Sequence, residues 1–146
     1  MIMPDLRGAT PDDLPAIVAL LKAYELPFED IDPARQEFIV AASENGIIGV
    51  VGLERSGAYG LLRSLAVETG QRSKGLGKAL LDEMLLHAWL KGVGEIYILT
   101  TTASGFFKKQ GFETAVRSDA PKVIQNTTEF RTVCPVSAAC MRKKIA

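Results

Sequence analysis

Residues 61–81 read LLRSLAVETGQRSKGLGKALL. The order of residue types in this stretch is the strongest indication of the fold. The apolar run over residues 61–67, with one charge at Arg63, has the composition of a strand. A polar turn follows over residues 68–74, and from Gly75 the apolar residues take helical spacing. The stretch predicts a strand, a loop and a helix, with glycines where the helix begins.

The start of that helix suits a phosphate group. The first N–H groups of a helix lack intrahelical partners, and the helix dipole adds partial positive charge there. Gly75 and Gly77 carry no side chain that would hold a phosphate away from the backbone. Arg72, Lys74 and Lys78 add positive charge nearby. The stretch therefore predicts a pyrophosphate site.

Two common phosphate motifs do not fit these residues. A P-loop needs Gly-Lys-Ser/Thr, whereas Leu76 and Gly77 follow Gly75. A dinucleotide fingerprint needs Gly or Ala where Leu80 stands. Residues 72–77 (RSKGLG) match Q/R-x-x-G-x-G/A, which resembles the acetyl-CoA signature of the GNAT N-acetyltransferases. The alternative is a helix start that only tolerates glycine.

Length and composition are those of one soluble domain. The 146 residues are 47% apolar and 23% charged, which predicts a single domain over residues 1–146. Seventeen basic and seventeen acidic residues balance, so nucleic acid and membrane surfaces are not expected partners. Because the sequence also has no charged leader and no apolar run near 18 residues, we expect a cytoplasmic protein.

Two cysteines, Cys134 and Cys140, stand near the C-terminus. In a cytoplasmic chain they are expected to be reduced thiols. Their C-x5-C spacing is not a zinc pattern, and the chain has one histidine, so no metal site is expected. An arsenic(III) or soft-metal dithiolate is the alternative.

Periodicity and turn signals predict the order β-α-β-β-β-α-β-α-β, with residues 138–143 suited to a last strand. The other strands are expected over residues 6–9, 38–42, 47–53, 59–67, 95–100 and 112–116, and the helices over residues 11–24, 75–91 and 103–110. Short turns join the middle strands, which favours an antiparallel meander. The fold class is α/β, with a mixed, mostly antiparallel sheet flanked by helices.

A second segment extends the resemblance to the GNAT family over nearly the whole chain. Residues 103–112 (ASGFFKKQGF) are similar to the family pattern A-x-x-F-Y-x-x-x-G-F. The resemblance implies that the strand at 61–67 splays from the strand at 96–100 and that the pantetheine arm of acetyl-CoA lies between them. It implies a neutral amine that attacks the thioester directly. The cofactor-binding residues that it implies are Leu65, Ala66, Val67, Arg72, Ser73, Lys74, Gly75, Leu76, Gly77, Lys78 and Phe107.

The groups that transfer protons are less clear. Phe107 stands where family members often have a tyrosine that protonates the leaving thiolate, so the proton donor is unassigned. Glu54 is our candidate for the general base, with Glu29 and Asp30 in an acidic loop as alternatives and a relay through water as a third. His87 lies about 18 Å along the helix from Gly75, and we interpret it as structural.

Arg63 is the main candidate for binding the acceptor. Strand alternation places positions 61, 63, 65 and 67 on one face, which by the family placement looks toward the acceptor. Arg63 either pairs with an acid or clamps a substrate carboxylate. Arg117, after the second motif, is a further candidate.

Several short segments together resemble the arsenic-resistance-associated ArsN-type branch of the family. They are residues 52–54 (GLE), 60–67 (GLLRSLAV), 99–103 (LTTTA), 128–130 (TEF) and 134–138 (CPVSA). The resemblance implies a small amino-acid acceptor, such as arsinothricin or phosphinothricin, and a possible homodimer. The alternatives are acetylation of a protein or peptide amine and a catalytically silent CoA-binding module.

Overall fold

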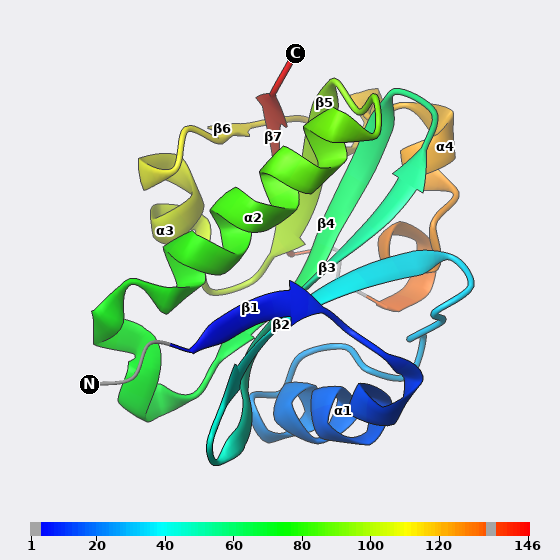
Figure 1. Cartoon of the computed structure of the whole chain (residues 1–146). Coiled ribbons are helices and arrows are strands. Elements are labelled where there is room, and N and C mark those ends of the chain that lie inside the picture. Colours follow the sequence, from blue (N-terminus) through cyan, green and yellow to red (C-terminus); the bar gives the residue numbers. More distant parts are fainter. Residues whose placement is uncertain (1–3, 134–136) are drawn as a thin grey trace.

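The computed structural model describes residues 4–133 and 137–146, apart from the side chains at 72–74, 132 and 133. The strands of the described residues form one sheet in the order β1-β2-β3-β4-β5-β7-β6 (Figure 1). Their bounds are β1 Asp5–Gly8, β2 Gln36–Ser43, β3 Gly46–Ser56, β4 Tyr59–Val67, β5 Glu95–Thr100, β6 Glu113–Thr114 and β7 Ala139–Lys144. The β4–β5 pair is parallel and the other pairs are antiparallel, so the predicted fold class is confirmed.

The helices begin where the sequence provides a start. Thr10 caps a 3₁₀ turn at Pro11–Asp13, and its backbone N–H donates to Asp13 Oδ2 at 2.8 Å. The remaining bounds are α1 Leu14–Ala23, α2 Leu76–Leu90, α3 Ser104–Lys109 and α4 Lys122–Gln125, with 3₁₀ turns at Thr69–Lys74 and Arg117–Asp119 and a π-helical turn at Glu129–Val133.

The helices cover both faces of the sheet (Figure 1). On one face, α2 and Phe107 of α3 pack on Val51, Leu53 and Leu62. On the other face, α1 packs on the β2–β3 side, and Ile124 of α4 packs beside Leu61. A sheet covered on both sides needs apolar residues in both alternating positions, which explains the nearly continuous apolar run of β4.

The sheet opens in its middle. The pairing of β4 with β5 runs from Tyr59–Glu95 to Leu61–Tyr97, and within the described residues it ends there. Residues 62–66 of β4 therefore face residues 98–100 of β5 without a ladder pairing between them. This is the splayed pair of strands that the sequence predicted.

A β-bulge in β4 corrects one prediction. Val50 pairs with Ala66 and Gly52 with Arg63, so Ser64 and Leu65 together stand opposite one residue of β3. The extra residue shifts the alternation of side chains. Leu65 and Val67 consequently belong to the α2 face, whereas Leu61 belongs to the opposite face. The prediction that positions 61, 63, 65 and 67 share one face was wrong.

The other differences concern short elements. Strand β6 holds only Glu113–Thr114 of the predicted 112–116, because Phe112 turns into the core against the Phe107 ring. The α4 helix and the π-helical turn were not predicted, since one turn of helix is too short for a periodic pattern. The remaining predicted elements agree within a few residues at their ends. In the described parts of the chain, no helix has the length and apolar character that crossing a membrane requires.

Candidate active site

The gap between β4 and β5 offers unpaired backbone to an extended ligand. Strand residues beyond Leu61 and Tyr97 have N–H and C=O groups that the neighbouring strand does not pair. Such an edge binds a chain with amide groups as an added strand. Leu65, half-buried, and Ala66, buried, lie along this edge, and the buried Val67 ends the strand. These residues fit the pantetheine position that the resemblance implies.

The residues of the predicted phosphate site lie at the end of this gap. The 3₁₀ turn Thr69–Lys74 leads to Gly75, which has φ +75° and precedes the first residue of α2. This left-handed conformation favours glycine. A Cβ at Gly75 would meet no described atom within 4 Å, so the helix start is open. The side chains of Arg72, Ser73 and Lys74 lie outside the described part of the structure.

Neighbouring residues hold this helix start in place. Leu76 is buried in the α2 cluster, which anchors the first turn. The backbone N–H of Thr69 donates to the Tyr24 hydroxyl at 2.8 Å, and this bond ties the loop to the end of α1. Lys78 is exposed and pairs with Asp82 at 2.6 Å, while a Cβ on Gly77 would lie 3.7 Å from the Phe106 ring.

Phe107 occupies a buried position. Its side chain is 2% exposed and packs edge-on against Phe106 and Phe112, with ring centroids 5.1 and 5.3 Å away. An aromatic hydrocarbon in this place contributes packing and no proton. Its contact with the cofactor stays a prediction.

Arg63 pairs with Asp30, one of the two alternatives that the sequence left open. Its Nη1 and Nη2 donate to Asp30 Oδ2 and Oδ1 at 2.5 and 2.6 Å, and its side chain is 0% exposed. Burial alone would lower the pKa of Arg63, but the bonds to Asp30 and the charges of Glu129 and Glu54 raise it. The guanidinium therefore stays charged inside the protein.

Gly52 makes room for this ion pair. A Cβ there would lie 2.7 Å from the Phe38 ring and 3.2 Å from Arg63 Cγ. The bidentate pair fixes Asp30, and with it the loop between α1 and β2, against the sheet. A substrate carboxylate reaches the guanidinium only by displacing Asp30.

A polar cavity of about 370 Å³ lies beside this pair. Its lining residues are Glu29, Asp30, Asp32, Arg35, Gln36, Glu54 and Thr128. Glu54 stands on β3 opposite Leu61, close to the point where the strands separate. Gln36 Nε2 donates to Glu54 Oε1 at 3.4 Å. The three carboxylates proposed as general base are thus brought together.

Arg117 lies in a different setting. Its Nη2 donates to the Phe130 carbonyl at 2.8 Å, and its guanidinium lies 5.5 Å from the centroid of the Phe130 ring. The structure therefore gives Arg117 a role in holding the π-helical segment. Contact with a substrate stays a prediction.

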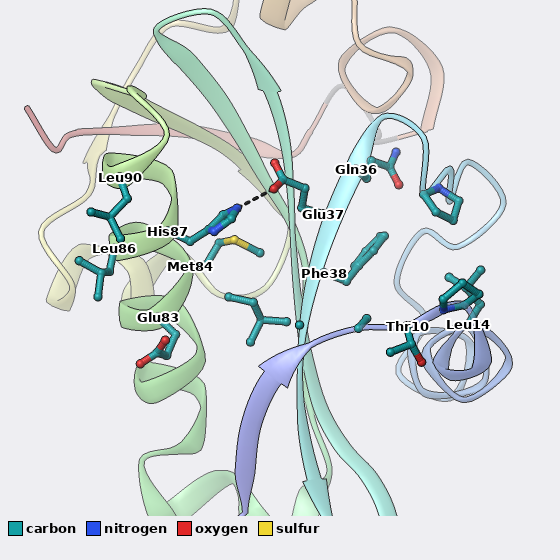
Figure 2. Close-up of a pocket in the computed structure, with 15 residues that line it drawn as sticks. Thr10, Leu14, Gln36, Glu37, Phe38, Glu83, Met84, Leu86, His87 and Leu90 are labelled. Atoms are coloured by element: carbon teal, nitrogen blue, oxygen red, sulfur yellow. Dashed lines mark hydrogen bonds and ion pairs between the residues drawn. The ribbon is translucent and has the colours of Figure 1, made fainter.

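A larger cavity, about 560 Å³, lies between the C-terminal half of α2, β2 and the start of α1 (Figure 2). In Figure 2, His87 points across it to Glu37, and their Nε2 and Oε2 atoms are 2.6 Å apart. Burial would raise the pKa of Glu37, but its bonds to Arg55 and His87 lower it. His87 is thus engaged in a hydrogen bond with Glu37 at the end of α2 away from Gly75.

The cysteine and metal predictions are only partly addressed. Cys140 is buried on β7, where burial raises the pKa of its thiol, and Cys134 lies outside the described residues. Across 4–133 and 137–146, no group of three His, Cys, Asp or Glu is placed to hold a metal ion.

Sequence reasoning missed two contributors to the site. Ser64 adopts φ +60° at the bulge, and Tyr24 anchors the phosphate loop. No local pattern marks either residue, because a bulge depends on the pairing partner and the Tyr24 bond joins positions 45 residues apart.

Comparisons with known proteins agree with this geometry. A family model described as an acetyltransferase (GNAT) domain matches residues 34–114. An uncharacterized N-acetyltransferase of Chlorobaculum tepidum is 29% identical over 143 residues, which cover 92% of this chain and 90% of the relative.

Solved structures share the fold at low sequence identity. N-acetylglutamate synthase from Neisseria gonorrhoeae, complexed with coenzyme A and N-acetyl-glutamate, is similar with a TM-score of 0.83 and 18% identity. The match covers 100% of this chain but 36% of the synthase chain. The Mycobacterium tuberculosis protein Rv2747, in complex with CoA, has a TM-score of 0.82 and 22% identity, with 98% of this chain and 100% of that chain covered.

The buried ion pair predicts a large effect of Asp30→Ala on stability. The variant leaves the Arg63 guanidinium buried without its carboxylate, which costs about 3–5 kcal/mol. Urea unfolding measures the change. Asp32→Ala is the control, because the Asp32–Arg35 pair is exposed and worth little. A double variant, Asp30→Leu with Arg63→Met, should regain much of the loss; equal stability of Asp30→Ala and the wild type would contradict the ion-pair argument.

Gly75→Ala should weaken CoA binding. A left-handed conformation costs a residue with a Cβ roughly 1–2 kcal/mol, so the loop would shift and affinity would fall by up to about thirtyfold. Titration calorimetry with CoA measures the effect. Gly105→Ala is the matched control, because Gly105 in α3 has no positive φ and no described atom within 4 Å of a Cβ. Unchanged affinity of Gly75→Ala would remove the loop from the phosphate site.

Proposed function

Since this chain belongs to the GNAT acetyltransferase family, it is an acyltransferase with acetyl-CoA as its cosubstrate, and we propose that it acetylates the α-amine of a small amino acid or analogue. Arsinothricin and phosphinothricin are the analogues suggested by the resemblance to the ArsN-type branch. The proposed setting is the cytoplasm, and the proposed assembly is a homodimer of single-domain chains.

The observation that carries the proposal is the opening between β4 and β5 next to the start of α2. The edge of β4 at Leu65, which lies beyond the pairing with β5, offers backbone groups to the pantetheine arm. The backbone of residues 72–78, with Gly75 in its left-handed conformation, offers N–H groups to the pyrophosphate. When bound, acetyl-CoA supplies an acetyl thioester that an amine attacks directly.

The acceptor would occupy the polar cavity beside the opening. Asp30 forms part of its wall, and the ion pair of Asp30 with Arg63 orients the loop between α1 and β2. Arg35 lines the same cavity and is largely exposed, so its guanidinium is a candidate partner for an acceptor carboxylate. A cavity of about 370 Å³ suits the size of a free amino acid. The amino-acid ligand of the N-acetylglutamate synthase structure is in line with this proposal.

Glu54 is proposed to take the proton of the attacking amine. It lines the cavity, stands opposite Leu61 and accepts a hydrogen bond from Gln36 that orients its carboxylate. Asp30 is less suited, because both its oxygens are engaged with Arg63. Glu29 and a relay through water are the alternatives.

The proposed acceptor class is tested by thiol release from acetyl-CoA with a panel of amines. The panel holds the proteinogenic amino acids, phosphinothricin, arsinothricin, polyamines and short peptides. We expect turnover with an amino acid or analogue and none with peptides. Turnover confined to peptides would favour a protein acetyltransferase, and tight acetyl-CoA binding without any turnover would favour a silent module.

With an acceptor in hand, Glu54→Gln should lower kcat by about 10²–10⁴-fold, because a positioned base is lost while size is kept. The loss should shrink as the pH rises, since more of the amine is then already neutral. Steady-state kinetics between pH 6.5 and 9.5 would measure it. Glu44→Gln, in an exposed turn, is the control. An unaltered pH profile of Glu54→Gln would instead favour the water relay.

A further inference from the structure

Ser64, at the bulge of β4, has a strained backbone conformation. Its φ of +60° is uncommon for a residue other than glycine, and such conformations cluster at functional sites. It lies in β4 beyond Leu61, where the pairing with β5 has ended. It immediately precedes Leu65, whose backbone is proposed to bind the pantetheine arm. The strain therefore sits where the thioester is expected.

The Ser64 hydroxyl is oriented by the buried ion pair. Arg63 Nε donates to Ser64 Oγ at 3.0 Å, while the two terminal nitrogens of Arg63 bind Asp30. A hydroxyl has one proton to donate and lone pairs that accept. Because Arg63 takes up the accepting side, the hydroxyl proton points away from the guanidinium. The positive charge also polarises the hydroxyl and makes it a stronger donor.

The leaving sulfur needs a donor that the family pattern does not provide here. Phe107 has no proton to give. The Tyr97 hydroxyl donates to Glu95 Oε1 at 2.6 Å, at the closed end of the β4–β5 pair. Burial, with Glu95, raises the pKa of Tyr97 to about 12. Ser64, by contrast, is half-buried and next to the open edge.

We propose that the Ser64 hydroxyl donates a hydrogen bond to the sulfur of acetyl-CoA as the carbon–sulfur bond breaks. Arg63 and Asp30 act as positioning residues. The amine nitrogen forms a bond to the acetyl carbon, and the sulfur takes the electron pair of the broken carbon–sulfur bond and leaves as a thiolate. The proton lost by the amine passes to Glu54. The thiolate later takes a proton from water. The proposal rests on the proposed function only in placing the thioester in the β4–β5 opening.

The test measures the thiol pKa of CoA bound to the protein, which requires no acceptor. Thiolate absorbance in the ultraviolet is titrated with pH, and the matching complex with desulfo-CoA is subtracted. A hydrogen bond to the charged form lowers a pKa, so Ser64→Ala should raise the pKa of the bound thiol by about one pH unit, a tenfold change in the thiolate equilibrium. CoA affinity below that pKa should stay within about twofold, by the same linkage between protonation and binding.

Ser64→Gly separates the lost hydroxyl from strain, since glycine accepts a positive φ. Both variants should raise the thiol pKa equally, and Ser56→Ala, at the far end of the β3–β4 pair, should not. An unchanged thiol pKa in both variants overturns the proposal. Loss of CoA binding in both also overturns it, because Ser64 would then only maintain the bulge. If the wild type binds CoA but acetylates no amine of the panel, the acceptor proposal fails and this one is still decided.

Discussion

Backbone N–H and C=O groups inside a protein need hydrogen-bond partners, and in the centre of this sheet the neighbouring strand does not supply all of them. Among the described residues, the parallel pairing of β4 and β5 ends at Leu61 and Tyr97, so residues 62–66 of β4 do not pair with β5, in the middle of the molecule rather than at its rim. A buried polar group without a hydrogen-bond partner costs free energy. A ligand that pairs with such a group recovers that free energy when it binds. The proposed phosphate loop, the bulge and the proposed acceptor cavity are all arranged around this opening.

The bulge and the buried Arg63 are two consequences of building such an opening. One extra residue in β4 turns Leu65 and Val67 toward α2 and leaves Arg63 on the opposite face. A guanidinium without solvent exposure has to be neutralised, and Asp30 does so from the loop between α1 and β2. The Arg63 guanidinium thereby holds Asp30 in the cavity wall and orients the hydroxyl of Ser64.

Sequence patterns predicted the frame of the site better than its interior. Local composition predicted strand β4 and the glycines at the start of α2. A resemblance carried by short motifs implied the splay of β4 from β5. The faces of β4 were not predicted correctly, because alternation assumes regular pairing and a bulge is set by the partner strand. Arg63 was correctly singled out, but only the structure shows that Asp30, 33 residues earlier, engages it. Short elements such as α4 leave no periodic signal.

The hydrogen bond between Thr69 and Tyr24 joins the two halves of the site. Tyr24 caps the C-terminal end of α1, and the acidic loop that carries Asp30 starts directly after it. The proposed cosubstrate and acceptor sites therefore share one anchor, the bond between Thr69 and Tyr24. A ligand that fixes the proposed phosphate loop also restrains the start of the loop between α1 and β2. The binding free energies of cosubstrate and acceptor are then coupled, and that coupling is reciprocal. An enzyme built in this way has a physical basis for taking up its two substrates in a preferred order.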